Sequence, residues 1–240
     1  VFQGMSFNDY ASYGTIAQKA AACVSRVKLM GGSQYIAWLE GMNEVDLNLW
    51  RFGAANNAAA ISMMVDMHTQ CYNALKADSA TSGIFIAAPS CTNTNGQIST
   101  DVNTAIQGMS SKYDAGNARW YSGKWEPNMP LSGVDGNGYG TIEKEISNAR
   151  ATAGGKTPVV ITECGYHNGI LVTLGHLPVR EDTASLYMPD VFTRPYSQGA
   201  RVVTNYQITD FITQDGRTQT DKSIDQENFG YLRYGAKEVK

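Results

Sequence analysis

The chain has 240 residues, of which 42% are hydrophobic and 17% are charged, with a formal net charge of -3. This length can bury a large core as one domain, and the composition excludes disorder as a description of the whole chain. Because Lys and Arg do not cluster, there is no electrostatic footprint for nucleic acid or an anionic membrane surface. A neutral partner therefore fits the sequence better. No apolar run approaches the roughly 20 residues that cross a bilayer, so we expect no transmembrane segment.

The first residues and the cysteines bear on processing and on metal binding. Residues 1–5, VFQGM, lack a basic region followed by an apolar run, and they resemble the remnant of a protease-cleaved tag. The four cysteines form no CxxC pair and have no His-rich neighbourhood, so we predict no metal site; they are Cys23, Cys71, Cys91 and Cys164. Free buried thiols are the favoured interpretation, and a single disulfide is the alternative.

Helical and extended segments alternate along the chain. Apolar residues at three- and four-residue spacing predict helices over residues 15–30, 54–78, 99–113, 139–153 and 181–198. Apolar runs bounded by turn residues predict strands over residues 35–39, 83–90, 118–125, 157–163 and 201–208. We expect Gly31 and Gly32 to end the first helix, and Pro189 and Pro195 to kink or shorten the last one. This alternation is typical of an α/β protein whose parallel sheet is doubly wound or closed into a barrel.

Two glutamates follow apolar strands at matching positions. Glu44 comes after the run IAWLEGMN, and Glu163 closes TPVVITE. A carboxylate at such a place is costly to desolvate unless it is paired, hydrogen-bonded or active in a cleft. Ligands bind at the carboxyl ends of parallel strands, and two carboxyl groups about 5 to 5.5 Å apart would suit a retaining glycosidase. For either glutamate alone, the alternative is a helix cap or an ion pair with an arginine.

The motifs around these glutamates resemble those of clan A glycoside hydrolases. GMNEVD (41–46) and ITECGYHN (161–168) are similar to the acid/base strand and the nucleophile strand of these retaining (β/α)8 barrels. GHLPV, YQITD and ENFGYLR then follow in the order seen in a bacterial branch with NEPD, TETGYHN and FGLLR motifs. The resemblance covers most of residues 20–235.

This resemblance implies an α/β fold of the (β/α)8 TIM-barrel type, in one partial domain spanning residues 1–240. The sequence matches only about strands 4 to 8 of such a barrel, because nothing before residue 15 corresponds to the first three strands. An arc of five strands would leave open sheet edges and a bare core. We therefore expect either a piece of a longer protein or a smaller, rearranged α/β form.

The resemblance also assigns roles to residues of this sequence. It makes Glu44 the general acid/base and Glu163 the nucleophile, and it makes Asn43 the partner of the sugar 2-hydroxyl. Tyr121 would hydrogen-bond the nucleophile, and Tyr206 would line the subsite of the attacked sugar. An oxocarbenium-like transition state needs these elements: a nearby anion, a proton donor and hydroxyl contacts.

Other positions depart from the family pattern or extend it. Arg119 stands where the branch has a histidine, and it would favour the charged form of a neighbouring carboxylate while filling part of the sugar subsite. Val45 replaces the usual proline after the acid/base. Aromatic faces stack on sugars, so Trp50, Trp120 and Trp125 are candidate sugar platforms, with core packing an equal alternative for each.

Polar and aromatic side chains elsewhere complete the expectations. His167 and His176 flank the loop after Glu163, where they could contact substrate hydroxyls. Glu40 is predicted to be a buried hydrogen-bond partner rather than a third catalytic group. Trp38 and His68 are predicted to pack in the core.

Two functions of different class fit the sequence. The first is a retaining glycoside hydrolase that cleaves a β-linked polysaccharide or oligosaccharide by a two-glutamate double displacement, without a cofactor. The alternative is a non-catalytic carbohydrate-binding or structural protein derived from such a barrel, favoured by Arg119 and the unmatched first strands. Both imply a carbohydrate partner, with no nucleic acid and no membrane. The substrate class implies a secreted protein, extracellular or periplasmic.

Overall fold

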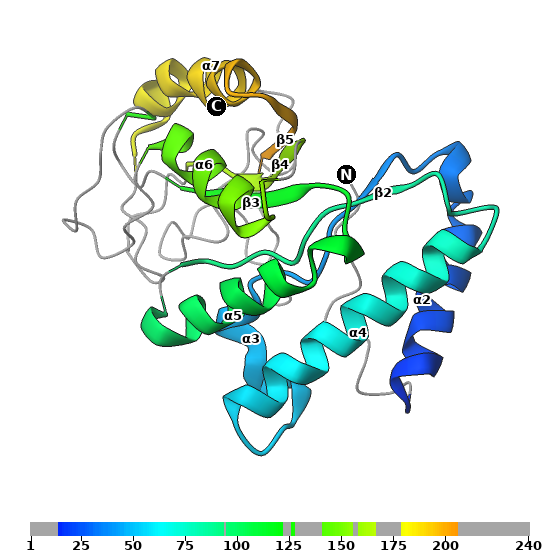
Figure 1. Cartoon of the computed structure of the whole chain (residues 1–240). Helices are drawn as coiled ribbons and strands as arrows, with labels where there is room; N and C mark the ends of the chain where they lie inside the picture. Colours follow the sequence, from blue (N-terminus) through cyan, green and yellow to red (C-terminus); the bar gives the residue numbers. More distant parts are fainter. Residues whose placement is uncertain are drawn as a thin grey trace, which may run out of the picture. The chain divides into compact units, whose positions relative to one another are not determined.

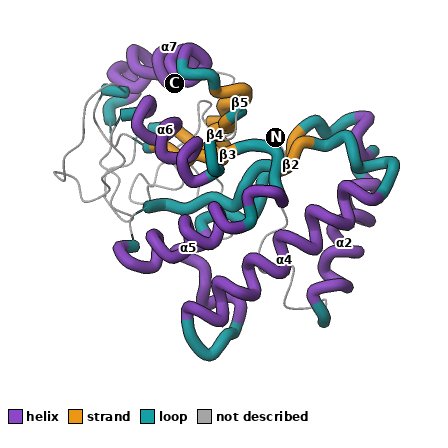
Figure 2. Tube along the Cα trace, viewed as in Figure 1, coloured by secondary structure: helices purple, strands orange, loops and turns teal. Residues whose placement is uncertain are grey.

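The computed structural model describes residues 14–93, 95–121, 126–127, 141–155, 158–166 and 179–205, in which helices and short strands alternate (Figures 1 and 2). The helices are α2 (Ile16–Leu29), α3 (Val45–Asn48), α4 (Asn57–Ala77), α5 (Gly96–Gly108), α6 (Ile142–Thr152) and α7 (Glu181–Ser197). The strands are β1 (Trp38–Leu39), β2 (Phe85–Ile86), β3 (Gly116–Trp120), β4 (Val159–Cys164) and β5 (Ala200–Asn205). Short 3-10 helices are η1 (Gly32–Gln34), η2 (Leu49–Phe52) and η3 (Ser110–Lys112).

The strands pair in the order in which they occur along the chain. β1 and β2 are parallel, with Trp38 opposite Phe85 and Leu39 opposite Ile86. A further parallel bridge joins Ala87, just after β2, to Ala115, just before β3. The second sheet has the order β3-β4-β5. Because a helix precedes each following strand, the chain has the helix-crossover connectivity that parallel pairing requires, which confirms the α/β class.

The chain divides into two compact units. Unit 1 comprises Val1–Ala118 and Asn148–Thr162, and unit 2 comprises Arg119–Ser147 and Glu163–Lys240. The boundaries fall inside β3, α6 and β4, so each of these elements contributes residues to both units. The single partial domain expected from the sequence stays a prediction. No helix in the described ranges is long and apolar enough to cross a membrane.

Helix α2 begins and ends where the sequence signals predict. Its N-terminal Thr15 forms a capping box with Gln18, in which the Thr15 hydroxyl accepts from the Gln18 N–H and the Gln18 side chain accepts from the Thr15 N–H. Arg26 and Lys28 lie in the last turn, where cations interact favourably with the helix dipole. Gly31 then adopts a left-handed conformation with φ of 95°. The predicted end of the helix at this glycine is confirmed.

The core of unit 1 lies where α2 packs along α4, which run side by side in Figure 1. Both helices bury one stripe of residues at three- and four-residue spacing, as amphipathic helices do. The buried members are Ala20, Cys23 and Val27 on α2, and Ala60, Met64, Met67, His68 and Leu75 on α4. His68 packs in this core as predicted, with its Nε2 2.8 Å from the Lys112 carbonyl. Its buried ring therefore has a defined partner.

Two sequence expectations need correction. Helix α7 runs through both Pro189 and Pro195 and ends at Ser197, so neither proline shortens it much. Trp38 was expected in the core, but its side chain is half-buried and stacks on Phe85 with the ring centroids 4.8 Å apart. Phe85 is itself 47% exposed, so this aromatic pair lies at the surface of unit 1.

Candidate active site

Glu163 stands near the end of β4, in unit 2. The preceding residues Val159 to Thr162 are all buried, as expected for a parallel strand covered on both faces. Glu163 is the first residue of β4 that reaches the surface, with 13% of its side chain exposed. The strand therefore presents a carboxylate that is partly accessible, yet almost surrounded by protein.

The carboxylate of Glu163 is held by two residues of the neighbouring strand. Arg119 in β3 forms an ion pair with its Oε2, and the hydroxyl of Tyr121 donates a hydrogen bond to its Oε1. The Arg119 side chain is only 3% exposed, so the ion pair is screened little by solvent. Both contacts favour the ionised form of the carboxylate and fix its orientation. The hydrogen bond expected between Tyr121 and the carboxylate is present.

Strand periodicity explains which β3 residues reach Glu163. Arg119 and Tyr121 are two residues apart, so their side chains leave the strand on the same face. Trp120, between them, points to the other face and is completely buried. Its burial matches the core-packing alternative and argues against an exposed sugar platform at this position.

Glu44 occupies an unusual backbone conformation at the end of the β1 segment, in unit 1. With φ of 46° and ψ of 55°, it is left-handed, a region that non-glycine residues enter only at a cost of about 1 kcal/mol or more. It precedes α3, yet its side chain makes no capping hydrogen bond to that helix. The helix-cap alternative for Glu44 is therefore not what the structure shows.

Ser90, after β2, holds the Glu44 backbone in place. Its hydroxyl oxygen accepts from the Glu44 N–H at 2.9 Å, and that hydroxyl lies 3.3 Å from the side-chain oxygen of Asn43. The Ser90 backbone pairs with Met42 and Val45 on either side, at 2.8 and 3.0 Å. The side-chain amide of Asn48 donates to the Glu44 carbonyl at 2.9 Å. The strain at Glu44 is thus over-determined by its neighbours, as at many functional sites.

Asp46 is a polar centre that sequence analysis missed. Its carboxylate is 2% exposed and accepts from the Thr92 N–H at 2.9 Å, the Thr92 hydroxyl at 2.7 Å and the Ser99 hydroxyl at 2.6 Å. These bonds tie the segment after Glu44 to the loop after β2 and to α5. The sequence shows only an aspartate after a strand, and its partners lie about fifty positions away, so no local pattern reveals the network.

Glu40 has the structural role that the sequence predicts. It is 5% exposed, and its carboxylate accepts from the Thr162 hydroxyl at 2.6 Å and from the Asn117 amide at 3.3 Å. The Thr162 hydroxyl also lies 2.7 Å from the Asn117 side-chain oxygen, but its one proton goes to the stronger acceptor, the carboxylate. All three residues belong to unit 1.

The structure brings together only some of the predicted site residues. Arg119, Tyr121 and Glu163 form one cluster in unit 2, and Asn43 and Glu44 share Ser90 in unit 1. Because the two glutamates belong to different units, their pairing stays a prediction. Tyr206, Trp125, His167 and His176 lie outside the described residues.

Two remaining expectations concern a tryptophan and metals. Trp50, in η2, is 74% exposed, with the Arg51 guanidinium 5.0 Å from its ring centroid. Its indole is available for stacking, as the sugar-platform interpretation requires. In the described ranges, no three His, Cys, Asp or Glu side chains gather in a way that could hold a metal ion.

No protein-family model matches the chain, and no curated protein matches it in sequence. Solved structures do match its fold. An endo-laminarinase from Formosa Hel1_33_131 has a TM-score of 0.58 at 9% identity, over 90% of this chain and 58% of that one. A glycoside hydrolase family 17 β-1,3-glucanosyltransferase from Rhizomucor miehei has 0.55 at 16% identity, over 90% and 66%. A glucosidase from Croceicoccus marinus has 0.57 at 10% identity, over 91% and 44%.

These similarities show a fold shared with part of several glycoside hydrolases. The chain spans 58% and 66% of the first two, so a substantial part of each of those proteins has no counterpart here. At such low identities the match concerns the backbone arrangement alone. The similarity therefore does not identify the catalytic residues of this chain.

Proposed function

We propose that the protein is a retaining glycoside hydrolase that cleaves a β-linked polysaccharide or oligosaccharide with Glu163 as nucleophile and Glu44 as acid/base. The observation that supports this most is the Glu163 carboxylate, held on one oxygen by Arg119 and on the other by Tyr121. The motifs around both glutamates, which resemble those of clan A, support the same reading. On this proposal the chain corresponds to about strands 4 to 8 of a (β/α)8 barrel, and the protein acts outside the cell or in the periplasm.

Glu163 has the properties that a nucleophile needs. A carboxylate that attacks an anomeric carbon must be ionised, oriented and largely desolvated before the sugar arrives. Arg119 and Tyr121 supply the first two conditions, and the 13% exposure of the Glu163 side chain supplies the third. A tyrosine hydroxyl on the nucleophile also stabilises the anion when it leaves in the second step.

Glu44 suits the acid/base role for a different reason. A proton donor has to be placed relative to the leaving oxygen, and a strained backbone locked by Ser90 and Asn48 gives a fixed position. In the first step Glu44 protonates the leaving-group oxygen while Glu163 bonds to the sugar. In the second step Glu44 takes a proton from water, which then releases the sugar from Glu163 with retained configuration.

The chain's neighbours in fold suggest which substrates to try first. Two of them are named for laminarin and for β-1,3-glucan, so β-glucans head the panel. The alternative function is a non-catalytic carbohydrate-binding or structural protein. It is favoured by Arg119, because a guanidinium on the nucleophile occupies space that a sugar would need.

The first experiment traps the covalent intermediate. Incubation with 2,4-dinitrophenyl 2-deoxy-2-fluoro-β-glucoside should add one fluoroglucosyl group to the peptide that contains Glu163. The fluorine slows both chemical steps, but the good leaving group keeps the first step fast, so the covalent intermediate accumulates. Glu163→Gln should remove the label, and Glu181→Gln, at the start of α7, should keep it. If wild type binds laminarin but neither cleaves it nor takes the label, the protein is a binding module.

The second experiment separates the two carboxylates by role. With Glu44→Ala, an activated substrate should still form the glycosyl-enzyme, and azide should restore turnover by replacing the base-activated water. With Glu163→Ala, azide should instead give a product of inverted configuration. Natural β-glucan turnover should fall by roughly 100- to 10,000-fold in either variant. Equal loss without azide effects in both would contradict the assignment of distinct roles.

A further inference from the structure

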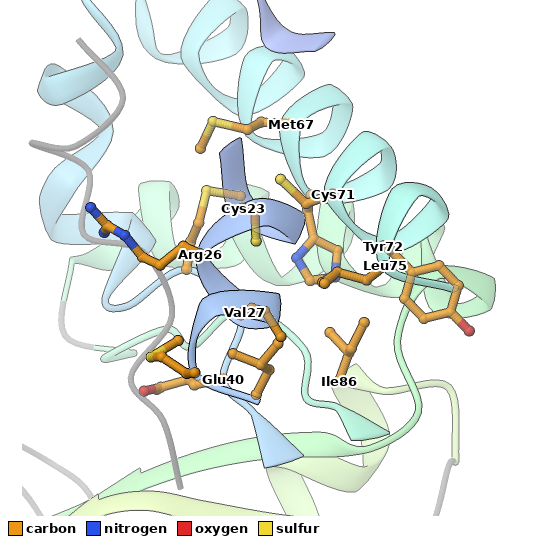
Figure 3. Close-up of a pocket in the computed structure, with 14 residues that line it drawn as sticks. Cys23, Arg26, Val27, Glu40, Met67, Cys71, Tyr72, Leu75 and Ile86 are labelled. Atoms are coloured by element: carbon orange, nitrogen blue, oxygen red, sulfur yellow. The ribbon is translucent and has the colours of Figure 1, made fainter. Parts of the chain in front are cut away.

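A small cavity in unit 1 lies between α2, α4 and the strands beside them, and Figure 3 shows the side chains that line it. Its volume is about 40 Å³. Two cysteines face each other across it, Cys23 from α2 and Cys71 from α4. A cavity of this size admits water and solutes of similar size, since one water needs roughly 10 to 15 Å³ of such space.

The helix pattern explains why the two thiols meet. Cys23 lies three residues after Ala20 and four before Val27, on the buried stripe of α2. Cys71 lies four residues after Met67 and four before Leu75, on the matching stripe of α4. Since the two helices pack along each other, the stripes face one another. Cys23 is 7% exposed, and Cys71 is half-buried.

The two thiols have different proton affinities. A hydrogen bond from Cys71 lowers the pKa of the Cys23 thiol, with the charge of Arg26 acting in the same direction against the opposing effect of burial. The same hydrogen bond, together with burial, raises the pKa of Cys71. These directions make Cys23 the more acidic thiol of the two and therefore the one that supplies the nucleophilic sulfur. Both cysteines are free thiols in the structure.

We propose that Cys23 and Cys71 form a redox-active dithiol that hydrogen peroxide converts into a disulfide linking α2 to α4. The Cys23 sulfur attacks peroxide, so that an S–O bond forms and the O–O bond breaks, and the proton of the Cys23 thiol goes to the departing hydroxide to give water. The Cys71 sulfur then attacks the sulfenic sulfur of Cys23, and an S–S bond forms as the S–O bond breaks. The Cys71 proton goes to the departing hydroxide. Two thiols lose two electrons in total, and one peroxide becomes two waters.

The other cysteines provide internal controls. Cys164 is completely buried in β4, and burial raises its pKa to about 12. Cys91 lies near the Asp46 carboxylate, and burial together with that negative charge raises its pKa. Neither is placed opposite another thiol in the described structure. Peroxide should therefore select Cys23 and Cys71 among the four.

The test treats the folded 240-residue chain with hydrogen peroxide, unfolds it to block the remaining thiols, and maps tryptic peptides without reduction. The expected result is a cross-linked pair of peptides 20–26 and 52–76, a mass loss of about 2 Da, and Cys91 and Cys164 still free. Dithiothreitol should restore both thiols. Native protein that keeps Cys23 and Cys71 free, or that pairs them with Cys91 or Cys164 as often as with each other, overturns the proposal.

Variants test the order of the two steps. With Cys71→Ser, the sulfenic acid on Cys23 has no partner, so dimedone should label peptide 20–26. With Cys23→Ser, dimedone labelling of Cys71 should be at least several-fold slower. Cys91→Ser combined with Cys164→Ser should behave like wild type. Preferential labelling of Cys71 would show that the roles are reversed, and absence of labelling in both single variants would remove the peroxide reaction altogether.

Discussion

Glu44 combines a left-handed backbone, which favours glycine, with a charged side chain. Glycine would adopt φ of 46° at no steric cost, yet the chain has a glutamate there. Sequence analysis singled out Glu44 for its place after a strand, but it could not foresee the left-handed backbone, because Ser90 and Asn48 impose it from outside the motif. The strained conformation is an observation separate from the motif, and it makes Glu44 a candidate for a functional role.

Glu44→Gly should therefore be more stable than Glu44→Ala by about 1 kcal/mol, because both remove the carboxylate and only alanine keeps the left-handed strain. Urea unfolding of the two variants measures the difference. Glu143→Gly and Glu143→Ala, in the helical conformation of α6, are the matched pair and should show the opposite order. Equal stabilities at position 44 would mean that the backbone there relaxes without strain.

His68 gives a prediction for pH. Burial lowers the pKa of its imidazole from 6.5 to about 4, against the opposing hydrogen bond to the Lys112 carbonyl. Between these pH values the unfolded chain binds a proton that the folded protein does not, so stability falls as the pH falls from 6.5 towards 4. The loss attributable to His68 should reach about 3 kcal/mol once the pH is below the folded pKa.

Urea titrations of wild type and His68→Gln at several pH values isolate this contribution. The free energy of unfolding of the variant should depend less on pH in this window, whereas the carboxylates contribute equally to both proteins. Parallel pH profiles for the two proteins would show that the His68 ring is hydrated rather than buried.

At the scale of elements, the sequence predicted the order and type of every long helix and of all five strands in the described ranges. Helix ends were predictable at Thr15 and Gly31 because the signals are local. The strands are shorter than predicted, β1 covering Trp38–Leu39 alone, because an apolar run also continues into loops that do not pair. Of the kink or early end expected at Pro189 and Pro195, the early end does not occur, because helix α7 continues to Ser197.

The approach of β1 to the loop after β2 yields a sharp prediction at Gly41. A Cβ there would lie 2.5 Å from the Pro89 nitrogen and 2.7 Å from the Ala88 carbonyl carbon, and both are backbone atoms that cannot turn aside. Gly41→Ala should cost about 3 kcal/mol and displace the segment that carries Asn43 and Glu44.

Gly108→Ala is the matched control for that substitution. No atom lies within 4 Å of a Cβ at position 108, which is the last residue of α5, so alanine should stabilise the protein by about 0.5 to 1 kcal/mol. Thermal unfolding of both variants checks the contrast. A neutral Gly41→Ala would show that the β1 segment can move away from Ala88 and Pro89 freely.

At the scale of the whole molecule, the cluster around Glu40 connects segments that are far apart in the chain. Its partners Asn117 and Thr162 come from β3 and β4, so one carboxylate satisfies donors separated by 77 and 122 positions from it. Glu40→Ala would leave both donors buried without this acceptor, at a cost of about 3 kcal/mol.

Glu40→Gln keeps a carbonyl oxygen for Thr162 and should cost less than half as much. Both variants should unfold at lower urea concentration than wild type, in that order, with the measurement made by circular dichroism. If Glu40→Ala were as stable as Glu40→Gln, the cluster would not hold the strands together.

The sequence could predict Glu40 as structural, because strand alternation fixes the side-chain faces. The contact of Tyr121 with Glu163 was expected only from the resemblance to a known family. It could not predict the division of β3 and β4 between two units. It also missed Asp46 and Ser90, whose roles depend on contacts that only the fold creates. The similarity to solved glycoside hydrolases concerns the fold alone, and sequence comparison found no relative, so the resemblance of the motifs stays a prediction.

The order Thr162–Glu163 along β4 has a consequence for insertions and deletions. Thr162 serves the Glu40 cluster of unit 1, and the next residue binds Arg119 and Tyr121 in unit 2. Because side chains alternate along a strand, the loss of one residue before position 162 would place the Glu163 carboxylate in the Glu40 cluster and Cys164 at Arg119. The gain of one residue would instead place Ile161 in the cluster and the Thr162 hydroxyl at Arg119. In a library of single-codon deletions, variants with a deletion in β4 should therefore fail to fold, whereas variants with a deletion at an exposed helix end should still give folded protein.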